Sequence, residues 1–300
     1  MTGPVLVTGA AGFVGGHLLR ELGERAVAAS ADVTDAAEVA RDLREAEPDA
    51  VVHLAAYASV ADSWENPVEV WRVNTLGTVA LLEAVRAERS AARVLVVSTS
   101  EVYGRAEALP TPEEEPLRPL SPYAASKAAA ELACERAARA DGMDVVVARA
   151  FPHLGPGQDE RFAVASWAAQ IARLEARGGG TLAVGDLSVE RDLTDVRDVV
   201  RAYRLLLEPS VAAGTYNVAS GRAVRLAEVV ETLVGLARCS VAVEVDEERL
   251  RPADVPVLCG DASRLAEATG WSPTIPLEQT LADTLAAARA SLGAEESART

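Results

Sequence analysis

A single lysine, Lys127, stands among the 29 basic residues of the chain, and it follows Tyr123 by four positions. Ser121 and Pro122 are typical of a helix start, because serine caps the first amides and proline fits the first turn. Residues four positions apart share one helix face, so we expect the ammonium to lie beside the phenol. The ammonium and the positive helix end both favour phenolate, which would lower the pKa of Tyr123 and suit it to acid–base catalysis.

Hydroxyl groups follow the valine-rich run of residues 94–98. Thr99 and Ser100 come directly after that run, and Glu101 comes next. If the run is a strand, these side chains stand at its carboxyl end, where an open parallel sheet binds its ligand. Hydroxyls at a strand end are often simple capping groups. We favour a catalytic role for Thr99 facing Tyr123, whereas Glu101 is either a solvated loop charge or a second catalytic base.

A glycine-rich turn lies near the start of the chain, with Gly9, Gly12 and Gly15 in a G-x-x-G-x-x-G arrangement that also contains Phe13 and Val14. Glycine permits the tight turn and lets the backbone approach a pyrophosphate, while a helix N-terminus adds partial positive charge. Such a turn can also be an ordinary connection. Its position between a first strand and a first helix predicts a dinucleotide-binding site.

The element that would distinguish NAD from NADP is harder to find. Asp32 lies about twenty residues beyond the glycine loop, where a carboxylate would bind the ribose diol of NAD. Asp32 and Val33 can instead contact the adenine, which leaves the 2′ position to Ser30 and its neighbours. The segment leaves NAD(H) and NADP(H) both open, and we slightly favour NADP(H).

Short apolar runs alternate with longer amphipathic segments through the first half of the chain, a pattern typical of βαβ units. The expected strands are residues 4–8, 26–29, 50–54, 94–98 and 144–148. The expected helices are residues 13–22, 36–45, 67–89 and 123–140. We therefore predict an α/β fold of the Rossmann type, with a doubly wound parallel sheet.

The composition changes after Phe151, where proline and glycine become frequent. We divide the chain into a dinucleotide-binding domain, residues 1–150, and a smaller substrate lobe, residues 151–300. The second part is expected to be rich in loops, with short helices and a strand over residues 215–219. Because no polar low-complexity linker separates the halves, we expect the lobes to interleave around a cleft.

The chain is acidic, with a formal net charge of −16. The absence of a basic stripe argues against nucleic acid or an anionic membrane as a partner. Cys134, Cys239 and Cys259 are widely spaced and odd in number, and the histidines do not cluster, so we predict neither a disulfide framework nor a metal site. Nothing resembles a signal peptide or a membrane span, which predicts a cytoplasmic protein.

The glycine loop, the strand end at residues 98–104 and the Tyr123–Lys127 helix together resemble the extended short-chain dehydrogenase/reductase family, whose members act on nucleotide-linked sugars. The likeness covers essentially the whole chain and includes residues 53–56, 73–78 and 155–157. Within the family, other segments look like reductases of GDP-linked 4-keto-6-deoxy sugars, and these are residues 62–64, 155–158, 191–198 and 250–256.

The resemblance implies a catalytic triad of Thr99, Tyr123 and Lys127, with Glu101 as a further catalytic candidate. It also completes the predicted binding residues, which are Gly9, Gly12, Phe13, Val14, Gly15, Asp32, Ala55, Ala56, Asn74, Tyr123 and Lys127 for the cofactor, and Thr99, Ser100, Arg191 and Arg251 for the substrate. Guanidinium suits the substrate's pyrophosphate because it directs two donors onto phosphate oxygens. Nearby aspartates, at positions 192, 195 and 198, would orient these arginines.

The function that the resemblance implies is an NAD(P)H-dependent reductase of the C4 carbonyl of a GDP- or dTDP-linked 4-keto-6-deoxyhexose. The Thr99–Glu101 stretch also resembles the catalytic triplet of sugar-nucleotide 4,6-dehydratases, and a 4-epimerase is a third possibility. A non-catalytic dinucleotide-binding module is disfavoured, because the acid–base residues are present. Pro152 stands where the family usually carries asparagine, and it supplies neither an amide side chain nor a backbone N–H.

The resemblance also implies a homodimer. The helices predicted over residues 67–89 and 123–140 carry many small or aliphatic side chains, among them Ala124, Ala128 and Leu132. We expect these side chains to pack closely across a twofold axis.

Overall fold

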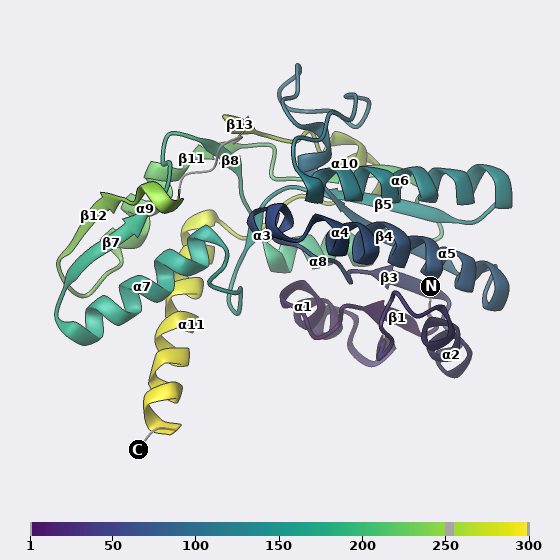
Figure 1. Ribbon diagram of the computed structural model, residues 1–300, viewed down its shortest axis with the longest axis horizontal. Helices are drawn as coiled ribbons and strands as arrows, with labels where there is room; N and C mark the ends of the chain where they lie inside the picture. The colour runs from purple at the N-terminus through teal and green to yellow at the C-terminus, as the bar shows by residue number, and fades with distance from the viewer. Residues whose placement is uncertain (1, 250–254, 299–300) are drawn as a thin grey trace.

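A parallel sheet forms the centre of the computed structural model, which describes residues 2–249 and 255–298 (Figure 1). Within these residues the sheet has six strands in the order β10-β5-β4-β3-β1-β2. They are β1 (Val5–Thr8), β2 (Ala26–Ala28), β3 (Ala50–His53), β4 (Arg93–Thr99), β5 (Val145–Ala150) and β10 (Gly214–Val218). The strand order reverses beside β1, and such a reversal marks the ligand-binding edge of a doubly wound sheet. The predicted Rossmann-type fold is confirmed.

Helices cover both faces of this sheet. One face carries α1 (Phe13–Leu22), α8 (Val196–Leu206) and α10 (Ser263–Thr269), and the other carries α2 (Ala36–Ala46), α5 (Gly77–Glu88) and α6 (Pro122–Asp141). Alternate residues of β1 serve the two faces, because Val5 and Val7 pack with Leu18 whereas Leu6 packs with Leu43. A strand that is covered on both sides is apolar at every position, which explains the unbroken apolar runs of the sequence.

The helix predicted over residues 67–89 forms without a break over residues 67–88, but it is not regular throughout. It consists of α4 (Pro67–Trp71), a π-helical turn (Arg72–Leu76) and α5, and a short helix, α3 (Val60–Glu65), precedes it. In the π turn, the Asn74 amide donates to Ser126 Oγ at 3.0 Å and Thr75 Oγ1 donates to the Ser126 carbonyl at 2.9 Å. Such turns are frequent at functional sites, and this one ties the segment to α6.

A second group of elements lies beside the sheet, at the left of Figure 1. Its helices are α7 (Ala163–Arg177), α9 (Leu226–Gly235) and α11 (Leu277–Ala298), which pack around the paired strands β7 (Gly180–Val184) and β12 (Val241–Val245). Two of these helices are long, at 15 and 22 residues, and were not expected. The helices on either side of residues 214–218 are short, as expected, with 11 residues in α8 and 10 in α9. None of the described helices has both the length and the apolar character that a membrane span requires.

Smaller elements complete the described structure. They are the three-stranded sheet of β11 (Ala223–Arg225), β8 (Glu190–Asp192) and β13 (Val257–Leu258), the pair β6 (His153–Leu154) and β9 (Thr194–Asp195), and the short 3₁₀ turns Gly23–Arg25, Ser100–Tyr103 and Glu247–Arg249. The strand predicted at residues 215–219 forms as β10, but it pairs with β5 in the central sheet and does not belong to the second group. The boundary at residue 150 stays a prediction.

Candidate active site

The three predicted catalytic side chains converge at the carboxyl end of β4. Thr99 is the last residue of that strand, and its hydroxyl shares a hydrogen bond with the hydroxyl of Tyr123. The predicted helix start is confirmed, because Ser121 Oγ accepts from Ala124 N at 3.1 Å and Pro122 occupies the first turn. One turn later, Lys127 Nζ donates to the carbonyl of Val97 at 2.7 Å.

Burial dominates the proton affinities of this cluster. It raises the pKa of Tyr123 to about 12, the Thr99 hydrogen bond acts in the opposite direction, and the charge of Glu101 raises the pKa further. Burial likewise lowers the pKa of Lys127 to about 8. The expectation that Lys127 and the helix end lower the pKa of Tyr123 is therefore wrong. Desolvation of the phenolate is the largest influence on this pKa, so Tyr123 is protonated at neutral pH.

A buried ion pair lies directly beneath the triad. Glu131, one helical turn after Lys127, pairs with Arg149 at 2.7 Å and accepts a hydrogen bond from Ser98. Ser98 of β4 is opposite Arg149 of β5 in the sheet, and Arg149 Nη1 also donates to the Tyr103 hydroxyl at 2.9 Å. The pair therefore joins α6 to β4 and β5 next to the Thr99 hydroxyl. We did not single out Glu131 from the sequence, although its four-residue spacing from Lys127 is a signal.

The glycine loop has the close backbone packing that the sequence predicted. Gly9 has φ +67°, and a side chain there would place its Cβ 2.7 Å from Ala55 N. At Gly15 a Cβ would lie 2.4 Å from the carbonyl oxygen of Gly9. Gly12 immediately precedes α1, and its N–H closes the turn on the Gly9 carbonyl at 3.0 Å. A backbone without side chains at the start of a helix fits the pyrophosphate of a dinucleotide.

Two apolar residues at the end of the glycine loop, one of them aromatic, attach the loop to the core of the central sheet. Phe13 and Val14 begin α1 and pack against the core of the central sheet. The ring of Phe13 also stacks on that of His153, with centroids 6.4 Å apart. Pro152 precedes this histidine, and its carbonyl accepts a hydrogen bond from Thr194 N.

A chain of hydrogen bonds connects the glycine loop to α6. Thr8, at the end of β1, contacts His53 Nδ1 at 2.8 Å, and His53 Nε2 contacts the Thr78 hydroxyl at 3.1 Å. Thr78 donates to the carbonyl of Asn74 at 2.6 Å, and the Asn74 side chain donates to Ser126. Burial lowers the pKa of His53 to about 3, so this imidazole is neutral. These contacts connect the glycine loop to α6 and fix the distance between them.

Residues around Ala55 and Ala56 follow β3 at the same edge of the sheet. Ala55 N donates to the Thr8 hydroxyl at 3.2 Å, next to the glycine loop. Asn74 binds this segment, because its Oδ1 accepts from Tyr57 N at 2.7 Å and its amide also donates to the Tyr57 carbonyl. The Asn74 side chain is buried, and its partners are protein groups, so it supports the segment that follows β3.

The remaining predicted residues lie farther from the triad or are already engaged. Ser100 is buried in the turn after β4. Asp32 is exposed, and its carboxylate accepts from Thr34 N at 2.9 Å and from the Thr34 hydroxyl at 2.8 Å. Arg191, on β8, donates to the carbonyl of Val255 at 2.8 Å. Arg251 falls outside the described residues.

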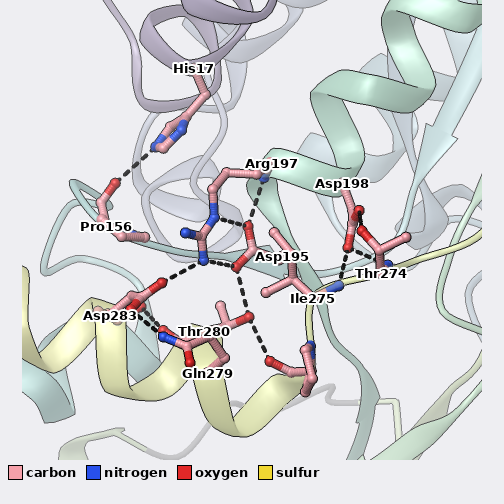
Figure 2. A network of polar contacts seen from close by, with 12 residues as sticks. His17, Pro156, Asp195, Arg197, Asp198, Thr274, Ile275, Gln279, Thr280 and Asp283 are labelled. Carbon is pink, nitrogen blue, oxygen red and sulfur yellow. Dashed lines mark hydrogen bonds and ion pairs between the residues drawn. The ribbon is translucent and has the colours of Figure 1, made fainter.

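The aspartates that were expected to orient the two arginines bind groups other than Arg191, so that expectation is wrong for Arg191, and Arg251 lies outside the described residues. Asp192 accepts from Ser220 N at 2.7 Å and is buried. Asp195 caps α8, binds Arg197, and accepts from Thr280 of α11 at 2.7 Å (Figure 2). Asp198 accepts from Thr274 and Ile275, just before α11. These carboxylates therefore join the two groups of elements.

Asp283 of α11 extends this junction by pairing with Arg197 at 2.7 Å (Figure 2). The guanidinium thus bridges carboxylates from α8 and α11. Despite the number of carboxylates here, no three His, Cys, Asp or Glu side chains of the described residues are placed to hold a metal ion.

Comparison with known proteins places this fold and site in a family. The model of the family described as GDP-mannose 4,6 dehydratase matches residues 21–284. The chain belongs to this family, which is part of the extended short-chain dehydrogenase/reductases. The predicted family is therefore confirmed.

Individual relatives resemble the chain over nearly its full length. GDP-6-deoxy-D-mannose reductase of Pseudomonas aeruginosa is 38% identical over 291 residues, which cover 94% of this chain and 95% of that protein. A solved structure of RMD from Pseudomonas aeruginosa complexed with NADPH has a TM-score of 0.89 at 37% identity, covering 97% of this chain and 100% of that one. A Thermus thermophilus UDP-glucose 4-epimerase complex with NAD has a TM-score of 0.85 at 31% identity, covering 95% and 99%.

Proposed function

We propose that this chain is an NADPH-dependent reductase of the C4 ketone of a GDP-linked 4-keto-6-deoxyhexose. The observation that carries the proposal is the protonated Tyr123 hydroxyl, hydrogen-bonded to Thr99 and tied through α6 to the glycine loop. A ketone reductase needs an acid at this place, since the carbonyl oxygen gains a proton as the carbon gains a hydride. The 38% identity to a GDP-6-deoxy-D-mannose reductase supports the choice of substrate.

The mechanism divides between the cofactor and the protein. NADPH, when bound, supplies the hydride that reduces C4. Gly9, Gly12 and Gly15 would hold its pyrophosphate. Tyr123 donates its proton to the C4 oxygen as negative charge develops there, and Thr99 donates a second hydrogen bond to the same oxygen. The ammonium of Lys127 then stabilises the phenolate that remains until solvent returns the proton.

Residues at the margin of the site would bind the sugar nucleotide. Ser100 and Thr99 would contact the sugar, and Arg191 and Arg251 would bind the pyrophosphate, whose oxygens match the two donors of a guanidinium. Arg191 lies on β8, the middle strand of the three-stranded sheet. A substrate held there would extend from this small sheet toward Tyr123.

A 4,6-dehydratase is the second candidate function. The matching family model bears that name, and the charge of Glu101 raises the pKa of Tyr123, so this carboxylate interacts electrostatically with the Tyr123 hydroxyl. In that reaction Tyr123 would act as a base and take the C4 hydroxyl proton while the oxidised cofactor takes the C4 hydride. Glu101 would then remove the C5 proton as the C6 hydroxyl leaves as water, and the same hydride would return to C6. A dehydratase therefore consumes no reduced cofactor, and neither does a 4-epimerase.

The distinguishing experiment mixes purified protein, NADPH and GDP-4-keto-6-deoxymannose and follows the absorbance of the reduced nicotinamide. Stoichiometric loss of NADPH, with a GDP-6-deoxyhexose as product, supports the reductase. A second reaction contains GDP-mannose in place of the keto sugar. Its conversion to the 4-keto-6-deoxy sugar without loss of NADPH supports the dehydratase. The same assay with the dTDP-linked ketone in place of the GDP-linked one tests which nucleotide the substrate carries.

We also propose that the chain forms a homodimer. Exposed apolar side chains gather on α3 to α6 and on the π turn, and they include Trp64, Val68, Leu76 and Leu132. A patch of this kind on a surface favours a protein partner. Ala124 and Ala128 face the interior of their own chain, so the expectation that they pack across a twofold axis is wrong. Light scattering of the wild type and of Leu132→Glu measures the mass directly.

A cytoplasmic location remains part of the proposal. Its support is chemical: the three cysteines of the chain are free, although the protein could have used them for disulfides. Fractionation of cells that express the chain would test it.

A further inference from the structure

The strand β12 has an open edge at the margin of the second group of elements, at the left of Figure 1. Within residues 2–249 and 255–298 its only neighbouring strand is β7, and the two strands run parallel. Two of its apolar side chains are well exposed, with 41% of Val243 and 61% of Val245 in contact with solvent. The proposed function gives this edge no role.

Hydrogen bonds at both ends of β12 show which of its backbone groups are used. The Ser240 carbonyl accepts from Gly180 N at 3.2 Å, and Asp246 N donates to the Val184 carbonyl at 2.8 Å. Since successive residues of a strand direct their backbone groups to opposite sides, residues 240, 242, 244 and 246 face β7. The N–H and C=O groups of the three valines, at positions 241, 243 and 245, therefore point away from β7.

The other edge of this small sheet is closed by a side chain. The amide of Gln170, on α7, donates to the Ala183 carbonyl at 3.2 Å, and its Oε1 accepts from Ala183 N at 3.1 Å. The carboxamide thus takes the place of a neighbouring strand along β7. In the part of the chain that the structure describes, no side chain closes the outer edge of β12 in this way. The strand also contains neither lysine nor proline, which commonly protect an open edge.

The valines of β12 extend an apolar face toward this open edge. Val243 is in register with Leu182 of β7, and Val245 is in register with Val184. Residues in register on neighbouring strands have their side chains on the same face, so the valines continue the core that contains Leu182 and Val184. Glu244, which is the only ionisable residue of the strand, lies on the opposite face.

We infer that β12 pairs with β12 of a second copy of this chain, antiparallel and about a twofold axis at Val243. The pair joins the two small sheets into one sheet of four strands. In an antiparallel pair, two residues that face each other with outward backbone groups exchange both of their hydrogen bonds. Val243 of each copy does so with Val243 of the other, and Val241 of each copy does so with Val245 of the other.

The order of residues in the strand favours this register over its neighbours. With the axis at Val243, all three outward-facing valines find partners, and Glu244 lies opposite Ala242 of the second copy. An axis at Ala242 engages only Val241 and Val243. An axis at Glu244 places two carboxylates directly opposite each other, which is destabilising. The strand is therefore complementary to itself in one register.

This contact is separate from the homodimer proposed above, which uses the exposed apolar side chains of α3 to α6. Two different twofold contacts on one chain give a closed tetramer or an extended row of copies. The mass of the protein in solution therefore reports both contacts. Leu132→Glu is designed to remove the first contact and leaves β12 unchanged.

Val243→Lys is the direct test, because it places two ammonium groups opposite each other at the axis. In the Leu132→Glu background, we expect light scattering to show dimers that dissociate on dilution. Val243→Lys should raise their dissociation constant by about tenfold or more. In the wild-type background, the same change should reduce a tetramer or larger assembly to a dimer. Thr181→Lys is the matched control, because it adds the same charge at an exposed position of β7 and should leave the mass unchanged.

Mixing two variants tests the register. Val243→Glu should also prevent association, but a mixture of the Val243→Lys and Val243→Glu proteins brings opposite charges together at the axis and should restore the dimer. A mixture of the Val245→Lys and Val245→Glu proteins should not restore it, because position 245 lies opposite Val241 and not opposite itself. Equal recovery in the two mixtures would contradict the axis at Val243.

An unchanged mass on Val243→Lys in both backgrounds, with folding verified by circular dichroism, overturns the inference. A folded Leu132→Glu protein that stays monomeric at every concentration also overturns it. These measurements contain no cofactor and no sugar nucleotide, so their outcome is independent of the reductase assay.

Discussion

Beneath the triad, at the β4–α6 end of the site, polar side chains are buried and closely paired, as Ser98, Glu131 and Arg149 show. At the β2–α2 end, the hydrogen bonds of Arg41 to Ser30 and Asp42 are long and 46% of its side-chain surface is exposed. The proposed function gives each end a different task, which would account for the difference. Proton transfer requires donors fixed within a fraction of an ångström, whereas attraction of an anionic cofactor requires only an available charge.

The largest expected effect is at Tyr123. Tyr123→Phe removes the acid and keeps the ring, so we expect the rate of ketone reduction to fall by roughly 10³-fold. Thr99, Lys127 and the ion pair beneath them remain in place, so the affinity for NADPH should stay near that of the wild type. The rate is measured from the absorbance of NADPH. Substantial residual turnover would show that another group supplies the proton.

Removing one partner of the buried ion pair should affect stability. Glu131→Gln leaves the charge of Arg149 uncompensated in the interior, and we expect a loss of about 3 kcal/mol in the free energy of unfolding. Glu83→Gln is the surface control, because Glu83 pairs with the exposed Arg86. We expect that change to cost less than about 1 kcal/mol. Urea denaturation measures both, and similar losses would contradict the contrast between the two environments.

The pH dependence of kcat/KM should report Lys127. Its pKa of about 8 means that the ammonium is present below that pH and is lost as the pH rises through it. Since the ammonium stabilises the phenolate left by proton transfer, we expect reductase activity to decline above about pH 8. Tyr123, with its pKa of about 12, adds no transition in this range. A kcat/KM that stays constant from about pH 7 to about pH 10 would exclude Lys127 as the titrating group.

The smallest expected effect is at Asp32, on the exposed end of the site. Because its carboxylate serves the Thr34 turn, Asp32→Asn should change the affinities for NADH and NADPH by less than about twofold, within the range of a surface substitution. Titration of both cofactors provides the measurement. A selective loss of NADH affinity would show that Asp32 binds the ribose after all.

Local pattern predicted much of the fold and part of the site. The strands of the first half form within two residues of their expected bounds, because apolar runs between turn residues leave few alternatives. The start of α6 was predicted from Ser121 and Pro122 for the same reason: capping depends on neighbours in the chain. The glycine loop also depends on neighbouring residues, and its close packing was expected from its motif.

The π turn could not be predicted, because it depends on contacts between distant segments. Asn74 and Thr75 break the regular helix by bonding to Ser126, which lies about fifty residues later in the chain. The pairing of β10 with β5 is similar, since its sequence shows a strand but not the neighbour that it will pair with. Long-range contacts of this kind leave no local signal.

The sequence by itself determined which groups this protein can use: a tyrosine and a lysine one turn apart, hydroxyls at a strand end and a loop of glycines. Only the tertiary structure decided their chemical state. Burial, which is a property of the packed interior, keeps the phenol of Tyr123 protonated and weakens the hold of Lys127 on its proton. Packing likewise directs the carboxylate of Asp42 onto the turn at Ser30 and leaves the guanidinium of Arg41 facing solvent.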